Sequence, residues 1–232
     1  MYDVSGNGPN EVKLERYTTE AEPHAYVESL DKVDAEDADR FLHVGVDTKS
    51  SCRSGTFIQK DSSVIHNSSC HLGVEILPIS EAIDKYDWLA EKYLWKSMDP
   101  EKDQFTAGAR KAPHEGFFMR IQAGTKVEHP IQSCLYIAKN NFSQNVHNVL
   151  VVEEGAEAHI ITGCATAPHL NSGLHVGVSE FYIEKNATLH YTMVHDWGES
   201  VNVRPRTVTH VAEGASYVSN YISLKPVGSL EM

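Results

Sequence analysis

Short runs of alternating hydrophobic and polar positions fill the second half of the chain, and small turn residues interrupt them at regular intervals. Four turn segments carry such a residue at equivalent places, separated by 31, 31 and 28 residues. These markers are Gly124, Gly155, Asn186 and Gly214. Glycine and asparagine most readily adopt the left-handed conformation of a tight corner, and a period of this length is typical of solenoids. We therefore predict a parallel β-solenoid over residues 116–232.

The strand pattern leaves one alternative open. An antiparallel sandwich with evenly spaced hairpins would produce similar runs of alternating residues. The fold class that we predict is mainly β, with a small N-terminal α+β cap in front of the solenoid.

The first half of the chain predicts this cap over residues 41–115. A strand-like sequence pattern begins at Phe41 with FLHVGVD. It continues in three short segments, residues 55–59, 63–66 and 73–77. The first 40 residues carry Gly, Pro and acidic residues without a lasting apolar period, so we expect residues 1–40 to form a mobile or loosely docked arm.

Two helices are predicted within the cap. Ser80 is a suitable N-cap, and the following residues place an apolar stripe at helical spacing. The stripe consists of Ala82, Tyr86, Leu89 and Tyr93. A second start signal, Asp99 followed by Pro100, predicts a shorter helix that extends towards Lys111.

Composition and charge exclude several classes of protein. Hydrophobic residues make up 41% of the chain and charged residues 22%, as in ordinary globular domains. The net charge of -12 argues against a nucleic-acid partner, because the phosphate backbone would be repelled. We find neither an apolar run of about 18 residues nor a secretory leader. We expect no membrane association and a cytoplasmic location.

The cysteines form no CxxC pair, which excludes a zinc ribbon or a thioredoxin-like motif. In a reducing cytoplasm they are expected to be free thiols. Cys52, Cys70 and Cys134 are interpreted as structural or incidental residues.

The 31-residue register gives Cys164 a specific neighbour. Residues 31 apart lie on successive coils, about 4.8 Å apart, and this spacing aligns Cys164 with His195. His169 follows in the next loop. A thiolate beside an imidazole can attack sulfur or bind iron, so these three residues are candidate metal ligands. The alternative is that Cys164 is a small corner residue and His195 a solvated loop histidine.

Several long sequence segments resemble the SufB/SufD core family, especially its short archaeal-type SufB members. The resemblance covers roughly residues 40–232 and includes RSGTFIQKD, KYDWL, QNVHNVLVVEEGAEAHIITGCATAPH, SGLHVGVSEFYIEKNATLHYTMVHDW and VRPRT. It implies a right-handed parallel β-helix and a role in iron–sulfur cluster assembly. The implied partners are a SufC-type ATPase, a sulfur donor, and a SufB or SufD partner or a second copy.

The resemblance also implies roles for individual residues. Cys164 matches the family's sulfur-accepting cysteine, and Arg120, His195 and Trp197 match positions that line a sulfur path inside the helix. Arg206 aligns less clearly, and its stretch could instead form salt bridges with the acidic surface. Bacterial SufB usually has Gln at the position of His195, so we expect the sulfur route to differ in detail.

A second departure from the family concerns the end of the chain. The sequence ends at Met232, inside a segment that continues into further coils in the family. We therefore expect the part that normally docks SufC to be missing.

The function that we predict is that of a non-enzymatic scaffold, which accepts sulfur on Cys164 and holds a transient iron–sulfur cluster. Two alternatives have weaker signals. A cupin-type metal enzyme is suggested by Gly124 followed by His129, but Ile131 occupies the place of the next histidine. A carbohydrate-acting β-helix would use Glu180 and Glu184, which do not form a convincing acidic set.

Overall fold

A computed structural model provides the structure of the protein and describes residues 12–49 and 53–232. The strands are β1 Gly55–Lys60, β2 Ser63–Ser69, β3 Val74–Pro78, β4 Phe117–Ile121, β5 Ile131–Ile137, β6 Phe142–Val152, β7 Glu157–Thr166, β8 Gly173–Ile183, β9 Thr188–Asp196, β10 Val201–Val211, β11 Ser216–Ser223 and β12 Ser229–Leu230. The helices are the 3-10 turns η1 Leu14–Arg16 and η2 Leu30–Lys32, and the α-helices α1 Ala35–His43, α2 Ile79–Lys85, α3 Asp87–Lys92 and α4 Gln104–Lys111.

The strands form two facing sheets within the described residues. One sheet has the order β11-β9-β7-β5-β1-β2 and the other β12-β10-β8-β6-β4-β3. The chain alternates between the sheets, and from β4 and β5 onward each strand pairs in parallel with the strand of the next coil. Only the β1–β2 and β3–β4 pairs are antiparallel among these strands. The parallel β-solenoid is confirmed, and the antiparallel sandwich is excluded.

The tight turns of the solenoid lie at the predicted markers. Gly124, Gly155, Asn186 and Gly214 have φ angles of 71°, 69°, 57° and 71°. The first three turns also bond to the turn of the next coil. The N–H of Gly155, for example, donates to the carbonyl of Lys185 at 2.9 Å. The repeat in the sequence therefore reflects a stack of identical corners.

The main hydrophobic core lies between the two sheets. Alternate residues of each strand point inward, as the two-residue period of a strand requires. In β6 these include Phe142, Val146 and Leu150, all fully buried. A buried side chain of this size contributes roughly 1.5–3 kcal/mol to folding, so stacking the coils stabilises the whole solenoid.

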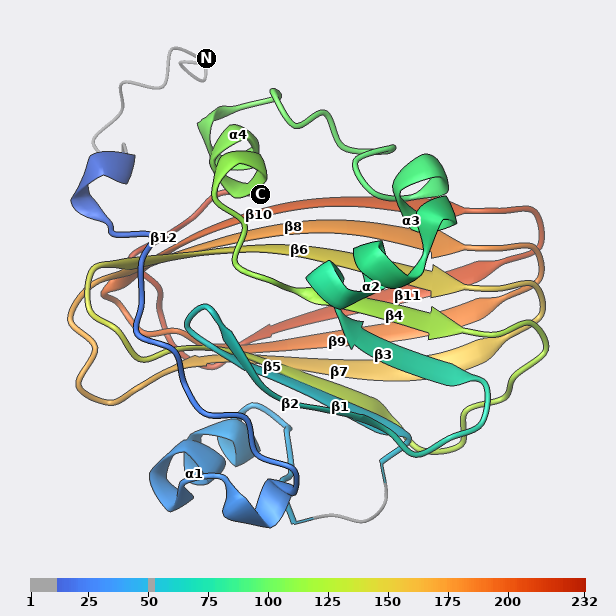
Figure 1. The fold of residues 1–232 in the computed structure, drawn as a ribbon, viewed down its shortest axis with the longest axis horizontal. Coiled ribbons are helices and arrows are strands. Elements are labelled where there is room, and N and C mark those ends of the chain that lie inside the picture. The colour runs from blue at the N-terminus through green and yellow to red at the C-terminus, as the bar shows by residue number, and fades with distance from the viewer. Residues whose placement is uncertain (1–11, 50–52) are drawn as a thin grey trace.

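Helices cover the outer faces of both sheets, as Figure 1 shows. Phe41 of α1 packs on one sheet, against a cluster that includes Cys134. Leu89 of α3 packs on the other sheet, next to Phe118. The outer faces of the sheets are therefore also buried over much of their length. Every residue of β6 is buried, because this strand is covered on both faces.

The predicted helix at Ser80 is divided into two short helices. It starts at Ile79, directly after Pro78, and Ser80 instead donates to Glu115 at 2.8 Å. Tyr86 has an extended backbone, with φ -129° and ψ 98°, and separates α2 from α3. Its hydroxyl donates to Glu75 at 2.6 Å, so a tertiary contact accompanies the break in the helix.

Two further local predictions were wrong. The second helix starts after Asp103, which forms a capping box with Thr106, and Asp99–Pro100 lies in the turn before it. The segment from Phe41, predicted as a strand, continues α1, whose N-terminus is capped by Asp34. The predicted boundary at residue 40 therefore falls inside a helix.

The described part of the expected N-terminal arm, residues 12–40, lies against the solenoid. Thr18 forms a parallel bridge with Phe142, and the N–H of Val27 donates to the carbonyl of Ile65 at 2.8 Å. The first eleven residues of that arm lie outside the described residues. In the described part of the chain, no helix is long and apolar enough to cross a bilayer.

Candidate functional site

Cys164 of β7 and His195 of β9 lie on adjacent coils, directly opposite each other in the strand register. Both side chains point into the space between the sheets, and each is 2% exposed. The prediction that the repeat places this thiol beside this imidazole is therefore confirmed. His195 is not a solvated loop residue, because it lies inside the solenoid.

A small cavity of about 30 Å³ adjoins these two side chains. Polar groups form much of its wall. They include Thr162, His175, Ser179 and the hydroxyl-bearing Tyr191. Since the interior next to the tight turns is apolar, this is a polar compartment beside a hydrophobic core.

Among the described residues, the imidazole of His195 has one hydrogen-bond partner. Its Nδ1 lies 2.8 Å from the hydroxyl of Tyr221 on β11. Its Nε2 is buried and has no partner among the described residues, and the same holds for Nε1 of the neighbouring Trp197. Buried polar groups are normally paired, so the unpaired Nε2 of His195, which lines the cavity, marks the compartment as a site that can accept a ligand atom.

The segment that carries His195 and Trp197 is anchored from outside. Asp196 lies between them, points outward and is 1% exposed. Its carboxylate pairs with Arg40 of α1 at 2.7 Å and with Lys225 at 2.9 Å. These ion pairs hold the two aromatic rings in their inward orientation.

Burial keeps the site electrically neutral. It raises the pKa of the Cys164 thiol, and it lowers the pKa of His195 to about 4 and that of His175 to about 3. At neutral pH the thiol is therefore protonated and both imidazoles are uncharged. The expectation that an imidazolium beside Cys164 would generate a resting thiolate is not met, because desolvation dominates.

The sequence analysis missed the polar residues on the facing sheet. Nδ1 of His175 donates to Oε1 of Gln144 at 3.0 Å, and the two residues are opposite each other in the register of β6 and β8. On the first sheet, Thr162 donates to Tyr191 at 2.9 Å. Gln144 and His175 are also 31 residues apart, so the same spacing rule would have found them.

Comparison with known proteins adds to this geometry. The SUF system FeS cluster assembly, SufBD core domain matches residues 135–227. An iron–sulfur cluster assembly SufBD family protein of Methanothermobacter thermautotrophicus is 42% identical over 226 residues, which cover 95% of this chain and 55% of the relative. The chain belongs to the SufBD family.

Other SufBD relatives match the chain at similar or lower sequence identity. A SufBD family protein of Archaeoglobus fulgidus is 43% identical over 191 residues, covering 82% of this chain and 51% of its own length. One of Staphylococcus aureus is 25% identical over 202 residues, covering 84% and 43%. The chain spans about half the length of the curated relatives it matches.

Two residues assigned to the sulfur path by the SufBD resemblance do not line the interior. Arg120 points outward from β4, pairs with Glu153 at 2.6 Å and lies over the ring of Trp88. Arg206 points outward from β10 and pairs with Asp103 at 2.5 Å and with Glu231 at 2.7 Å. Both therefore form salt bridges on the outer face, and Trp197 and His195 are the inward members of the predicted set.

His169 is not part of the compartment either. It is exposed in the loop after β7, where Nε2 lies 3.2 Å from the carbonyl of Ala138. No group of three or more His, Cys, Asp or Glu side chains in the described ranges is arranged to hold a metal ion. The predicted ligand set of Cys164, His195 and His169 is thus not assembled in this structure.

The other cysteines lie apart from the site. Cys134 is adjacent in the strand register to Gly163, but it points outward into the cluster under α1. Cys70 is exposed. Cys52 lies outside the described residues. Cys164 is therefore the thiol that the described structure places inside the solenoid.

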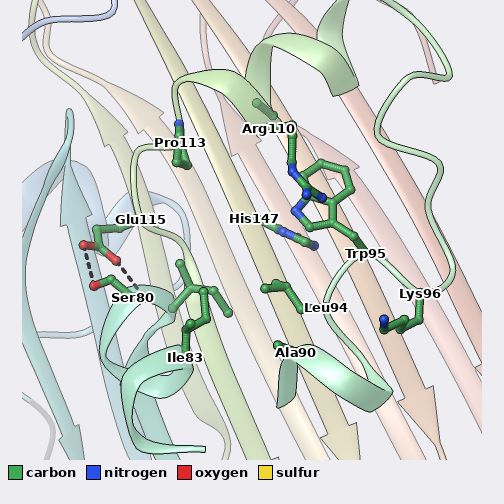
Figure 2. Close-up of a pocket in the computed structure, with 12 residues that line it drawn as sticks. Ser80, Ile83, Ala90, Leu94, Trp95, Lys96, Arg110, Pro113, Glu115 and His147 are labelled. Atoms are coloured by element: carbon green, nitrogen blue, oxygen red, sulfur yellow. Dashed lines mark hydrogen bonds between the residues drawn. The ribbon is translucent and has the colours of Figure 1, made fainter. Parts of the chain in front are cut away.

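A larger groove lies on the outer face, between α2–α3 and α4, and is shown in Figure 2. Its volume is about 540 Å³. His147 at its floor is bonded to the buried Glu180 at 2.9 Å. Glu180 also accepts the N–H groups of Trp95 and Ser97, both at 2.6 Å. This pair anchors the loop before α4.

The residues that suggested a carbohydrate-acting β-helix or a cupin-type metal enzyme are not placed for either function. Glu180 is fully buried by the contacts above. Glu184 accepts a hydrogen bond from Tyr93 at 3.0 Å, and His129 is exposed in a loop. None of these arrangements favours a carbohydrate-cleaving pair or a cupin-type metal site.

Proposed function

We propose that this chain is a scaffold component of iron–sulfur cluster assembly, in which Cys164 accepts sulfur inside the solenoid. The observation that carries the proposal is the inward-facing thiol of Cys164, the only one among the described residues, in a polar compartment of a largely apolar core. Membership of the SufBD family supports the same direction. A structural cysteine would not need an imidazole with an unpaired buried nitrogen beside it.

The compartment suits the handling of reactive sulfur. A persulfide exposed to water and free thiols is rapidly exchanged, and the surrounding sheets exclude both. The sulfur atom and the iron are the cargo of the scaffold, and the cluster is held only transiently before transfer. Turnover of a small organic substrate is not part of this proposal.

The partners that we propose follow from the family rather than from a contact in this chain. They are a sulfur donor, a SufC-type ATPase, and a SufB or SufD partner or a second copy. The net charge of -12 makes a nucleic-acid partner unfavourable. The proposed setting is the cytoplasm, where thiols remain reduced.

The first prediction tests the sulfur acceptor. Cys164→Ser removes the inward thiol with little change in volume, so sulfur uptake and formation of a visible-absorbing cluster under anaerobic conditions should both be lost. Bound sulfur is measured by mass spectrometry of the peptide that contains residue 164, and cluster formation by absorption.

Two matched variants serve as controls. Cys70→Ser removes an exposed thiol and Cys134→Ser a buried thiol on the outer side of the same sheet. Both should retain sulfur uptake at Cys164. If the Cys164→Ser protein is folded and still assembles a cluster at the wild-type level, the proposed role of Cys164 is wrong.

A further inference from the structure

Resting on the proposed function, we propose that the cavity beside Cys164 holds a single added sulfur atom, and that Tyr221 positions His195 to donate a hydrogen bond to it. The proposal combines three observations. They are the size of the cavity, the unpaired Nε2 of His195, and the contact between Tyr221 and Nδ1 of the same ring.

The cavity has the capacity for one atom beyond the thiol. Its volume is about 30 Å³, and a buried water needs roughly 10–15 Å³ of such space. One sulfur atom bonded to Cys164 therefore fits, whereas an organic ligand or a preformed cluster does not. The side chains that surround it, among them Thr162 and His175, are themselves hydrogen-bonded and leave this volume open.

Tyr221 determines which nitrogen of His195 carries the proton. A phenol is a stronger hydrogen-bond donor than acceptor, and the basic nitrogen of a neutral imidazole is a good acceptor. At 2.8 Å the hydroxyl of Tyr221 donates to Nδ1. The proton of the neutral ring is then on Nε2, which is the nitrogen without a partner in the buried compartment.

A donor at Nε2 distinguishes a persulfide from a thiol. Neutral sulfur in a thiol is a weak acceptor, whereas the terminal sulfur of a persulfide anion accepts a charge-assisted hydrogen bond. The protonated Nε2 of His195 therefore favours the sulfur-loaded state of Cys164. This gives a reason for leaving a polar nitrogen unpaired inside a packed core.

The loading step balances with a donor persulfide as the co-reactant. The sulfur of Cys164 forms a bond to the outer sulfur of the donor, and the sulfur–sulfur bond of the donor breaks. The inner sulfur of the donor leaves with the bonding electron pair and takes up the proton lost by Cys164. With the donor persulfide as an anion, the Cys164 thiol and the donor persulfide anion thus become a Cys164 persulfide anion and a donor thiol, without an external oxidant or reductant.

The first measurement tests the positioning of His195 independently of sulfur transfer. Nitrogen-15 NMR of the His195 ring should show the tautomer with the proton on Nε2 in the wild-type protein. In Tyr221→Phe this tautomer should give way to a mixture. Tyr221 is 39% exposed, so loss of its hydroxyl should not unfold the protein. Tyr217→Phe, on the same strand and without a contact to His195, should keep the wild-type spectrum.

The second measurement tests the sulfur pocket. After treatment with inorganic polysulfide, the peptide with Cys164 should carry one additional sulfur atom and no more. In Tyr221→Phe the lifetime of this persulfide towards a thiol reductant should fall about twofold, because in a mixture of tautomers only about half of the molecules carry the donor at Nε2. In a His195→Gln background, whose amide donor has no tautomers, Tyr221→Phe should have no effect.

The outcomes separate the two proposals. If Tyr221→Phe leaves the tautomer of His195 unchanged, the positioning role is wrong, whatever happens to sulfur. If the tautomer changes but the persulfide lifetime does not, the hydrogen bond to sulfur is wrong. If wild-type Cys164 takes up no sulfur, the proposed function fails, while the NMR result still decides the role of Tyr221.

Discussion

The two ends of each coil enclose different interiors. Next to the tight turns the space between the sheets is filled by apolar side chains, such as Val152, Ile183 and Leu189. Towards the longer loops the same strands carry polar inward residues, among them Gln144, His175 and His195, together with Cys164. One solenoid thus contains a hydrophobic part and a compartment lined by polar side chains and a thiol.

The difference shows how stability and function are divided within one repeat. Apolar side chains at the turn end are favourable in every coil, because stacking removes them from water. Polar groups at the loop end are costly to bury unless they are paired. Their presence there, together with the unpaired Nε2 of His195, indicates that this end is shaped by chemistry rather than by stability.

The largest effect is expected from the apolar end. Phe181 is 1% exposed, and its ring lies 4.8 Å from that of Tyr191. Phe181→Ala should lower the free energy of unfolding by about 3–5 kcal/mol, because it removes buried surface and leaves a cavity. Urea denaturation measures this change.

A matched variant at the polar end sharpens the comparison. Thr162→Val keeps the volume but removes the hydroxyl that bonds to Tyr191 and Ser133, so it should cost about 1–3 kcal/mol. If Thr162→Val lowers the free energy of unfolding as much as Phe181→Ala does, the polar compartment is a principal source of stability. The assignment of stability to the apolar end of the coils is then wrong.

An effect smaller than that of Phe181→Ala, and similar to that of Thr162→Val, is expected from pH at the polar end. The pKa of His175 in the folded protein, about 3, lies below the ordinary value of 6.5 because burial disfavours the charged ring. The unfolded chain therefore binds more protons between these values, and stability falls as the pH is lowered below 6.5. At pH 4.5 the loss due to His175 should be about 2.5 kcal/mol relative to pH 7.

The same measurement on two variants isolates this contribution. His175→Gln should lose that part of the acid sensitivity, measured as the difference in urea denaturation between pH 7 and pH 4.5. His169→Gln changes an exposed histidine and should keep it. Equal acid sensitivity of His175→Gln and the wild-type protein would show that His175 does not titrate as a buried neutral residue.

The smallest effect is expected at the tight turns. Gly155 has a φ of 69°, and an added Cβ would meet no atom within 4 Å. Gly155→Ala should therefore cost only the backbone strain of about 1–2 kcal/mol. Asn186→Gly, at the equivalent corner, should change stability by less than about 0.5 kcal/mol. A larger loss in Asn186→Gly would mean that the asparagine side chain supports its corner.

Much of the solenoid could be predicted from spacing alone. The turn residues Gly124, Gly155 and Asn186 and the pairing of Cys164 with His195 follow from one 31-residue rule, because successive coils must stack in register. The direction of Arg120 could also have been predicted. It lies between the buried Met119 and Ile121, and the alternation of a strand sends it outward.

The errors in the N-terminal half have a different origin. The helical stripe through Tyr86 was correct in its period, but the bond from Tyr86 to Glu75 draws that residue out of the helix. The helix that begins at Ala35 is short and rich in charge, and its stability comes largely from packing on the solenoid. Such contacts between distant residues leave little trace in local sequence.

The sequence by itself determined the period, the corners and the neighbours of each residue on the next coil, since these depend on local conformation and on counting. Only the tertiary structure decided the electrostatic state of the site and its closed shape. Burial from both sheets makes Cys164 a neutral thiol and His195 a neutral imidazole, and the contact from Tyr221 arises on a strand one coil further on. Desolvation depends on everything that surrounds a group, so no local pattern reveals it.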